Sequence, residues 1–210
     1  MIPVKVLALR ELTSASPALC KALNAPKGSP CLGLITTDCD DATYIALDEA
    51  TKAADVKVCY THSFYAGASN ASTPYAGEVI GILAAATPGA LRSGMEAAVS
   101  ALERIGFEEV NGVPYLAHTV SRSGSFLAKE AGVQEGTALA YLIAPPLESM
   151  YAIDAAMKAA DVTLQKLYSP PSETNFGGGL LAGSRSACEA ACSAFARAVA
   201  EVAANPKGGI

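Results

Sequence analysis

Apolar residues recur along the chain with two different periods, and each period predicts a different kind of element. The short run Leu32–Thr36 and the alternating segment Val56–Tyr60 are typical of strands. The segment Ser186–Ala204 is typical of an amphipathic helix, because its apolar residues are spaced by 4, 3, 4 and 3 positions. That stripe consists of Cys188, Cys192, Phe195, Val199 and Val202, and a similar stripe consists of Leu91, Met95, Ala98, Leu102 and Ile105.

One segment of the chain occurs twice. Asp48–Val56 reads DEATKAADV and Asp154–Val162 reads DAAMKAADV, so seven of nine positions are identical at an offset of 106 residues. The surrounding pattern of apolar runs repeats as well. A repeat of about half the chain length indicates a duplicated module. We therefore predict two domains, residues 1–106 and 107–210.

Each half shows the same order of predicted elements: strand, short helix, strand, helix, strand, loop, strand and long helix. In the first half they are Val4–Leu9, Pro17–Leu23, Leu32–Thr36, Ala42–Ala54, Val56–Tyr60, Glu78–Ala84 and Gly89–Ile105; in the second they are Tyr115–Val120, Ser125–Ala131, Leu139–Ala144, Leu147–Ala160, Val162–Leu167, Leu180–Gly183 and Ser186–Ala204. Asp40 or Asp41 is the expected N-cap of the first middle helix, and Pro145-Pro146 suits the start of its counterpart. The predicted class is α+β, with small, mostly antiparallel sheets flanked by helices.

Composition excludes several classes of protein. Hydrophobic residues make up 51% of the chain and charged residues 17%, which argues against intrinsic disorder. The net charge is −5 and no Lys/Arg cluster occurs, so a nucleic-acid surface is not expected. The longest apolar run, Val79–Leu91, is too short to span a bilayer, and no signal peptide is visible. The six cysteines form no CxxC pair, so we expect reduced thiols in a soluble cytoplasmic protein.

Two weakly charged loops, Thr61–Pro74 and Ser169–Gly179, follow equivalent strands in the two halves. Both are rich in small polar residues and carry aromatic side chains, a composition that suits a lid or gate. The run Gly177-Gly-Gly179 matches no phosphate-binding pattern, and we expect it to be flexible.

Acidic residues form the clearest candidate binding site. Asp38, Asp40 and Asp41 lie close together in the sequence, and Glu78 opens a predicted strand. Such a group could hold an ammonium ligand or a hard metal ion. Alternatively, one aspartate caps the helix while the others are solvated in its first turn. The second half has Pro145-Pro146-Leu147 at the equivalent place, so the two halves do not share this site.

Other candidate chemistry is weak. Cys188 and Cys192 lie on the apolar stripe without further ligands nearby, which favours core packing over a metal site. Cys39 stands among carboxylates that disfavour its thiolate. His62 and His118 belong to no recognisable catalytic motif. We predict no catalytic residues, no cofactor and no metal.

The repeated DEATKAADV and DAAMKAADV segments resemble the helix-to-strand motif of bacterial microcompartment (BMC) shell domains. Further motifs extend the resemblance, in order, along nearly the whole chain: Thr36–Tyr44, Ser63–Gly67, Ala76–Val79, Val120–Ser125, Ala144–Glu148 and Pro170–Phe176. Together they are similar to the L-type shell proteins of ethanolamine-utilisation microcompartments.

The resemblance implies two tandem, circularly permuted BMC domains in a structural, non-enzymatic protein. It implies a homotrimer with pseudo-sixfold symmetry, a pseudohexamer that tiles the shell with other shell proteins inside the cytoplasm. Lys52 and Lys158 match the family's edge lysine, which packs across the boundary between neighbouring tiles. No membrane or nucleic-acid partner is implied.

The resemblance also implies pores. A central pore would be gated by the two loops, with Phe64, Tyr65, Gly67, Asn175, Phe176 and Gly177 as gating residues. Small pores within each subunit would bind ethanolamine through Asp40, Asp41, Glu78 and the segment around Phe107. Related compartments process choline, so the ligand could differ. The competing hypothesis is a small-molecule sensor or enzyme that uses the Asp40/Glu78 acidic site without assembly.

Overall fold

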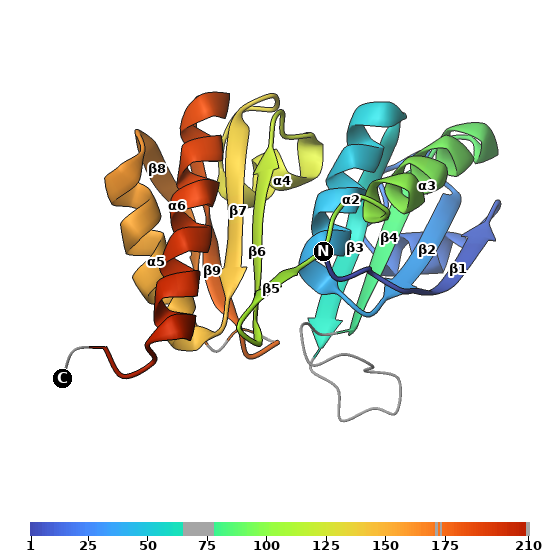
Figure 1. Cartoon of the computed structure of the whole chain (residues 1–210). Coiled ribbons are helices and arrows are strands. Elements are labelled where there is room, and N and C mark those ends of the chain that lie inside the picture. The colour runs from blue at the N-terminus through green and yellow to red at the C-terminus, as the bar shows by residue number, and fades with distance from the viewer. Residues whose placement is uncertain (65–77, 171, 173, 209–210) are drawn as a thin grey trace. The chain divides into compact units, whose positions relative to one another are not determined.

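A computed structural model describes residues 1–64, 78–170, 172 and 174–208 of the chain (Figure 1). The residues group by their contacts into two compact units. The N-terminal unit consists of Pro3–Gly106 together with Gly124–Leu127, and the C-terminal unit consists of Phe107–Ser123 and Ala128–Ile210 together with Met1–Ile2. The predicted division lies between residues 106 and 107. Compared with it, Met1–Ile2 group with the C-terminal unit and Gly124–Leu127 group with the N-terminal unit.

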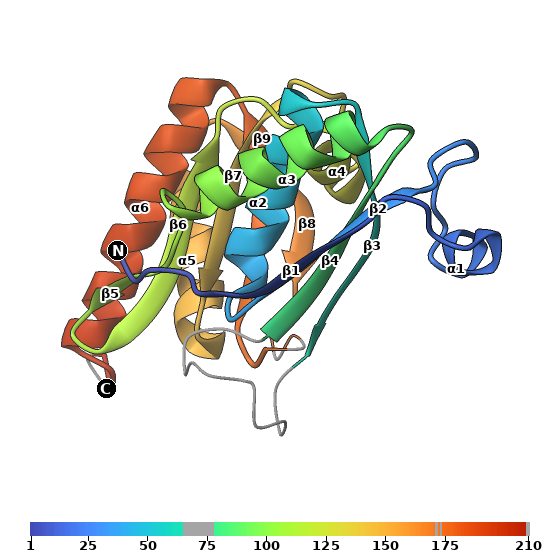
Figure 2. The same ribbon diagram turned by 90° about the vertical axis from the view of Figure 1, so that its right-hand side faces the viewer.

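The N-terminal unit has one antiparallel sheet in the order β1-β2-β4-β3. Its strands are β1 (Val6–Leu12), β2 (Cys31–Thr37), β3 (Val56–Phe64) and β4 (Glu78–Ala85), and its helices are α1 (Pro17–Ala22), α2 (Asp40–Ala53) and α3 (Pro88–Leu102). Helices α2 and α3 pack on each other and cover one face of the sheet. The α1 segment covers part of the other face, where Cys20 and Leu23 pack near Leu32 (Figure 2).

The C-terminal unit repeats this arrangement with one additional strand, in the order β5-β6-β7-β9-β8. Its strands are β5 (Glu108–Val110), β6 (Val113–Val120), β7 (Ala138–Ala144), β8 (Val162–Tyr168) and β9 (Gly177–Gly183), and its helices include α5 (Pro146–Ala159) and α6 (Arg185–Ala204). Helix α4 (Ser125–Ala131) begins in the segment that groups with the N-terminal unit. The predicted α6 stripe is confirmed, because Cys188, Phe195 and Val199 are fully buried in the core of this unit.

Backbone details repeat between the halves. The β3–β4 and β8–β9 ladders shift register at equivalent places, Val58/Tyr60 and Leu164/Lys166. After the short helices, Asn24 and Gly132 both have left-handed backbones, with φ of 55° and 68°. Gly28 and Gly136 match in the same way. These pairs fix an offset of 108 residues between the α1 and α4 segments.

Three predicted details are wrong. Cys39, not Asp40 or Asp41, is the N-cap of α2, because the two aspartates already occupy the first helical positions. Strand β5 was not predicted, although Val110-Asn-Gly-Val113 is a strong hairpin signal and both turn residues have positive φ. Gly177–Gly179 belong to β9 and pair with Ala144, Ile143 and Leu142, so they form a buried strand and not a flexible loop.

Candidate functional site

Sheet register brings the acidic residues to one end of the N-terminal unit. Thr37 pairs with Val79 in the β2–β4 ladder, so Asp38 and Glu78 follow at the same end of the sheet. Helix α2 starts two residues later with Asp40 and Asp41. Four carboxylates therefore gather where β2 ends and β4 begins. Asp38 belongs to this group, as the acidic cluster in the sequence indicated, although it was not among the residues expected to bind ethanolamine.

All four of these carboxylates are more than nine-tenths buried. Solvated aspartates in the first turn of α2 are thereby excluded. Asp38 accepts a hydrogen bond from the Lys5 backbone N–H at 2.8 Å, and Asp40 accepts one from the Asp41 N–H at 2.9 Å. The Glu78 Oε2 atom is buried and has no hydrogen-bond partner among the described residues. A buried carboxylate oxygen without a donor is costly, so a donor brought by a ligand would stabilise it.

Cys39 lies inside the acidic group and is not a nucleophile. Burial raises the pKa of its thiol well above the ordinary value, and Asp40 and Asp41 raise it further. One helical turn after Cys39, the Thr43 hydroxyl donates a hydrogen bond to the Cys39 carbonyl at 2.7 Å and lies 2.6 Å from the Thr37 hydroxyl. These hydrogen bonds hold the turn that presents the aspartates.

Within the described part of the chain, no three His, Cys, Asp or Glu side chains are arranged to hold a metal ion. The four buried carboxylates supply negative charge and hydrogen-bond acceptors, which are the groups that recognise a cationic organic ligand.

Two residues predicted for different roles, Phe107 and Phe176, contact each other in the C-terminal unit. Their ring centroids are 5.7 Å apart with the planes tilted by 37°, and both side chains are buried. The Phe107 carbonyl accepts a hydrogen bond from the Ile2 N–H at 2.6 Å. Phe176 follows Asn175, whose φ of 66° places it in the left-handed region of a tight turn. The proposed ligand segment and gating segment are thus in direct contact in this unit.

The other residues predicted to gate the pore lie partly within and partly outside the described residues. Phe64 is the last residue of β3, while Tyr65 and Gly67 lie outside the described residues. Gly177 is buried as the first residue of β9, so it cannot act as a flexible loop residue. Its neighbours explain the glycine run: a Cβ on Gly178 would lie 1.9 Å from the Leu142 carbonyl oxygen.

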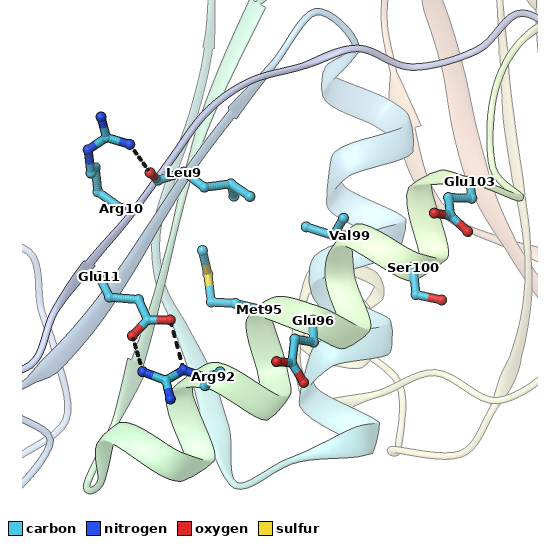
Figure 3. Close-up of a pocket in the computed structure, with 9 residues that line it drawn as sticks. All are labelled: Leu9, Arg10, Glu11, Arg92, Met95, Glu96, Val99, Ser100 and Glu103. Atoms are coloured by element: carbon cyan, nitrogen blue, oxygen red, sulfur yellow. Dashed lines mark hydrogen bonds and ion pairs between the residues drawn. The ribbon is translucent and has the colours of Figure 1, made fainter.

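A pocket of about 700 Å³, which the sequence analysis missed, lies between β1 and α3. Figure 3 shows Leu9 and Met95 pointing toward each other beside Val99, while Arg92 pairs with Glu11 at 3.3 Å. The equivalent elements of the C-terminal unit are β6 and α6. They pack directly on each other, and the Thr119 hydroxyl contacts Cys192 Sγ at 3.4 Å. The pocket is separate from the acidic group.

Comparisons with known proteins cover nearly the whole chain. The BMC domain family model matches residues 31–115. The bacterial microcompartment shell protein EutL of Clostridium perfringens is 55% identical over 99% of this chain and 98% of its own length. The EutL shell protein of Salmonella typhimurium is 47% identical over 98% of this chain and 96% of its own. The chain belongs to the EutL family of bacterial microcompartment shell proteins.

The fold agrees with that of EutL. The crystal structure of EutL from C. perfringens superposes with a TM-score of 0.93 and covers 99% of this chain and 96% of that one. The BMC match begins at the first residue of β2 and omits β1 and α1. The omission of β1 and α1 is expected in a permuted domain, where this strand–helix pair has moved from the end of the domain to its start. The two units are tandem, permuted BMC domains of a shell protein, and no described helix has the length and apolarity needed to cross a bilayer.

The two lysines that match the BMC edge position differ in their surroundings. Lys52 Nζ lies 3.6 Å from Asp48 and pairs with Glu49, and its side chain is mostly covered. Lys158 Nζ lies 2.5 Å from Asp154 and its side chain is exposed. Each lysine pairs with the aspartate one helical turn earlier, which draws its ammonium group back along its own helix toward that turn.

Proposed function

We propose that this chain is a non-enzymatic EutL-type shell protein that assembles into pseudohexameric homotrimers and passes ethanolamine through small pores. Full-length similarity to EutL and the duplication of one α+β unit support the assembly. The observation that carries the ligand assignment is the buried Glu78 Oε2 without a donor beside three further buried carboxylates.

A primary ammonium group fits this acidic end. It carries one positive charge and three N–H donors, so it can neutralise part of the carboxylate charge and donate to Glu78. Asp40 and Asp41 would accept further hydrogen bonds from the same ammonium group. Choline has no N–H donor, so its ammonium group could not donate a hydrogen bond to the Glu78 oxygen. Ethanolamine is therefore the preferred ligand.

Titration calorimetry tests this site. We expect Glu78→Gln to weaken ethanolamine binding at least tenfold, because a charge-assisted hydrogen bond is lost. The control is Glu96→Gln, a carboxylate on α3 away from the acidic group, which should bind like the unmodified protein. Equal ethanolamine affinity in the Glu78→Gln variant, or equal affinity for choline in the unmodified protein, would reject the assignment.

The central pore would open and close by rearrangement of the two loop regions. Phe64, Tyr65 and Gly67 contribute from the first region, and Asn175 and Phe176 from the second. The Phe107–Phe176 contact joins the second region to the proposed ligand segment, so a ligand that binds one arrangement better would shift the populations. Phe176→Ala should remove this coupling. Ethanolamine-dependent changes in loop proteolysis, present in the unmodified protein and lost in the variant, would support it.

Lys52 and Lys158 would form contacts between neighbouring tiles and with other shell proteins. We expect the double variant Lys52→Ala/Lys158→Ala to form trimers but few two-dimensional arrays in negative-stain microscopy. Arrays of unchanged extent would contradict the edge role. Purified protein that stays as discrete monomers would favour instead the sensor or enzyme that uses the Asp40/Glu78 site.

A further inference from the structure

The pocket between β1 and α3, called here the β1–α3 pocket, lies within the N-terminal unit. Its volume of about 700 Å³ falls in the range of roughly 300–1,000 Å³ that is typical of small-molecule sites. Leu9 from β1 and Met95 and Val99 from α3 give it an apolar part (Figure 3). Because burial of apolar surface is favourable in water, this part of the pocket suits the apolar body of a small organic molecule.

Met95 forms the base of the β1–α3 pocket without filling it. A Cβ on Gly33 of β2 would lie 2.5 Å from Met95 Sδ, so the thioether rests directly against the glycine. Strands β2 and β7 correspond at an offset of 107 residues, and the counterpart of Gly33 is Ala140. The glycine therefore makes room for Met95 on β2, and the space between Met95 and Leu9 stays open.

Acidic groups outnumber basic groups around the β1–α3 pocket. It is lined by three carboxylates and two guanidinium groups, which belong to Glu11, Glu96, Glu103, Arg10 and Arg92. Arg92 binds Glu11 at 3.3 Å and also attracts Glu96, so two carboxylates share one guanidinium group. Arg10 donates a hydrogen bond to the carbonyl oxygen of the preceding residue at 2.7 Å. Two positive and three negative groups leave the lining with a net charge of −1.

Glu103 lies at the C-terminal end of α3, where the helix itself favours a cation. It is the C-cap residue of α3, and the carbonyl groups at a helix C-terminus carry partial negative charge. The neighbouring Arg104 donates a hydrogen bond to Ser100 Oγ at 3.2 Å. A carboxylate at this end does not stabilise the helix dipole. A cationic ligand would be attracted both by the carboxylate and by the helix end.

The equivalent place in the C-terminal unit has neither a carboxylate nor a helix end. The N-caps of α3 and α6, Thr87 and Ser184, place the two helices at an offset of 97 residues. The counterpart of Glu103 is Ala200, and α6 continues beyond it to Ala204. The fold of the unit therefore requires neither feature at this position, and both are available to a ligand.

We infer that the β1–α3 pocket binds an amphipathic organic cation whose ammonium group lies beside Glu103 at the end of α3. The apolar body of the ligand lies on Leu9, Met95 and Val99. Residues 95 and 103 are about 12 Å apart along the helix axis, so a body of about six carbon atoms reaches from one to the other. The inference goes beyond the proposed function, because the β1–α3 pocket is separate from the acidic group that contains Glu78. Ethanolamine is too short to span the pocket.

An NMR titration of the full-length protein with hexyltrimethylammonium tests the inference. The quaternary head of this probe has no N–H donor for Glu78, and excess ethanolamine in the buffer keeps the acidic group occupied. The carbon-13-labelled methyl group of Met95, assigned with Met95→Leu, reports on the pocket. We expect its signal to shift with a dissociation constant of about 1 mM. The signals of Met150 and Met157, which belong to the C-terminal unit, should stay in place.

Two related probes separate the apolar contribution from the charge contribution. Butyltrimethylammonium should bind about tenfold more weakly, because two fewer methylene groups are buried. Hexanoate should also bind about tenfold more weakly or worse, because its carboxylate meets an acidic lining. A Met95 signal that does not move with hexyltrimethylammonium, or that moves equally with hexanoate, would overturn the inference.

Charge reversal at the end of α3 tests where the ammonium group lies. Glu103→Lys should bind hexanoate more tightly than hexyltrimethylammonium, with the affinity for the cation reduced about tenfold. The matched control is Glu189→Lys, an exposed carboxylate on α6, which should keep the preference for the cation. An unchanged preference in Glu103→Lys would contradict the assignment.

Two substitutions should close the pocket without changing its charge. Val99→Phe fills it from the side of α3, and Gly33→Ala pushes the Met95 thioether into it from β2. Both variants should lose binding of hexyltrimethylammonium, and thermal unfolding checks that they are folded. Binding that persists in folded variants of both kinds would show that the probe binds another surface, and the inference would fail.

Glu78→Gln separates this inference from the proposed function. This variant should lose affinity for ethanolamine but keep the affinity for hexyltrimethylammonium. If it loses both, the probe binds the acidic group and the β1–α3 pocket is not the site. If it keeps both, the proposed ethanolamine site is wrong and the assignment of the β1–α3 pocket stands.

Discussion

Asp48 Oδ2 lies 2.7 Å from the backbone nitrogen of Gly124, a residue 76 positions later in the chain. The carboxylate is completely buried, and its other oxygen accepts the Leu127 N–H. Gly124 has no side chain that could cap α4 itself, so the aspartate supplies the cap. The absence of a Cβ at residue 124 also lets the backbone approach Thr51 and the Asp48 carbonyl.

Gly124→Ala should destabilise the protein by about 1–3 kcal/mol, because the added methyl group overpacks this contact. Its Cβ would lie 2.7 Å from the Asp48 carbonyl oxygen, a backbone atom that cannot rotate away. Urea unfolding gives the free energy of unfolding. Gly89→Ala is the matched control, since nothing lies within 4 Å of its Cβ in the first turn of α3. Equal stabilities of the two variants would contradict the close approach.

Asp48 should make the free energy of unfolding depend on pH. Burial raises the pKa of its carboxyl, although the Gly124 and Leu127 N–H groups and Lys52 lower it in part. Between the unfolded value of about 3.9 and the raised folded value, the folded state holds a proton that the unfolded state has released. The contribution of Asp48 is therefore fully present below about pH 3.9 and is lost as the pH rises through the folded value.

Asp48→Asn removes this titration. The stability of the variant relative to the unmodified protein should improve as the pH is raised from 4 to 7, even if the variant is less stable throughout. Urea unfolding of both proteins at several pH values measures the difference. If the stability of the variant relative to the unmodified protein stays constant with pH, or falls as the pH is raised, then burial does not dominate the pKa of Asp48.

Gly178→Ala should be more damaging than Gly124→Ala. The added Cβ would lie 1.9 Å from the Leu142 carbonyl oxygen within the β7–β9 ladder, so the two strands would have to separate. We expect a loss of about 3 kcal/mol or more, at the upper end of overpacking effects. Thermal unfolding followed by circular dichroism measures the loss. A variant as stable as the unmodified protein would restore the flexible-loop interpretation of Gly177–Gly179.

Buried and half-buried thiols should resist alkylation in the folded protein. Burial raises the pKa of Cys39 well above the ordinary value and that of Cys59 and Cys192 to about 11. Because the thiolate is the reactive form, iodoacetamide at pH 7.5 should modify these three residues slowly. Mass spectrometry of tryptic peptides gives the rate at each site, and all six cysteines should react in denaturant. Rapid modification of folded Cys39 would contradict its buried, acidic surroundings.

Periodic segments were predictable because their pattern follows from local geometry. The α6 stripe, the α5 start at Pro145-Pro146 and, apart from β5, the order of elements in each half agree with the structure. Strand β5 was missed because three residues give too short a pattern, although Asn111-Gly112 marked its turn. The prediction of a flexible loop at Gly177–Gly179 was wrong because a glycine indicates either a flexible backbone or close packing. The Leu142 carbonyl oxygen beside Gly178 shows that close packing applies here.

The candidate site also combines features that the sequence predicted with features that only the structure shows. The sequence identified Asp40, Asp41 and Glu78 as a possible group, but whether they are solvated or buried depends on neighbours far away in the chain. The register that sets Thr37 opposite Val79 brings Asp38 and Glu78 to one end of the sheet. The pocket between β1 and α3 has no sequence signature, because the separation of two packed elements is a property of their arrangement in space.

By itself the sequence determined the duplication, the α+β class, the order of elements and the resemblance to microcompartment shell proteins, since each of these is carried by residue type and spacing. The tertiary structure decided which copy of a repeated residue is buried. Asp48 and Asp154 occupy identical positions in nearly identical motifs, yet one is buried beneath residues 124–127 and the other is exposed. Burial depends on what packs against a residue, and a repeat copies the residue without copying its neighbours.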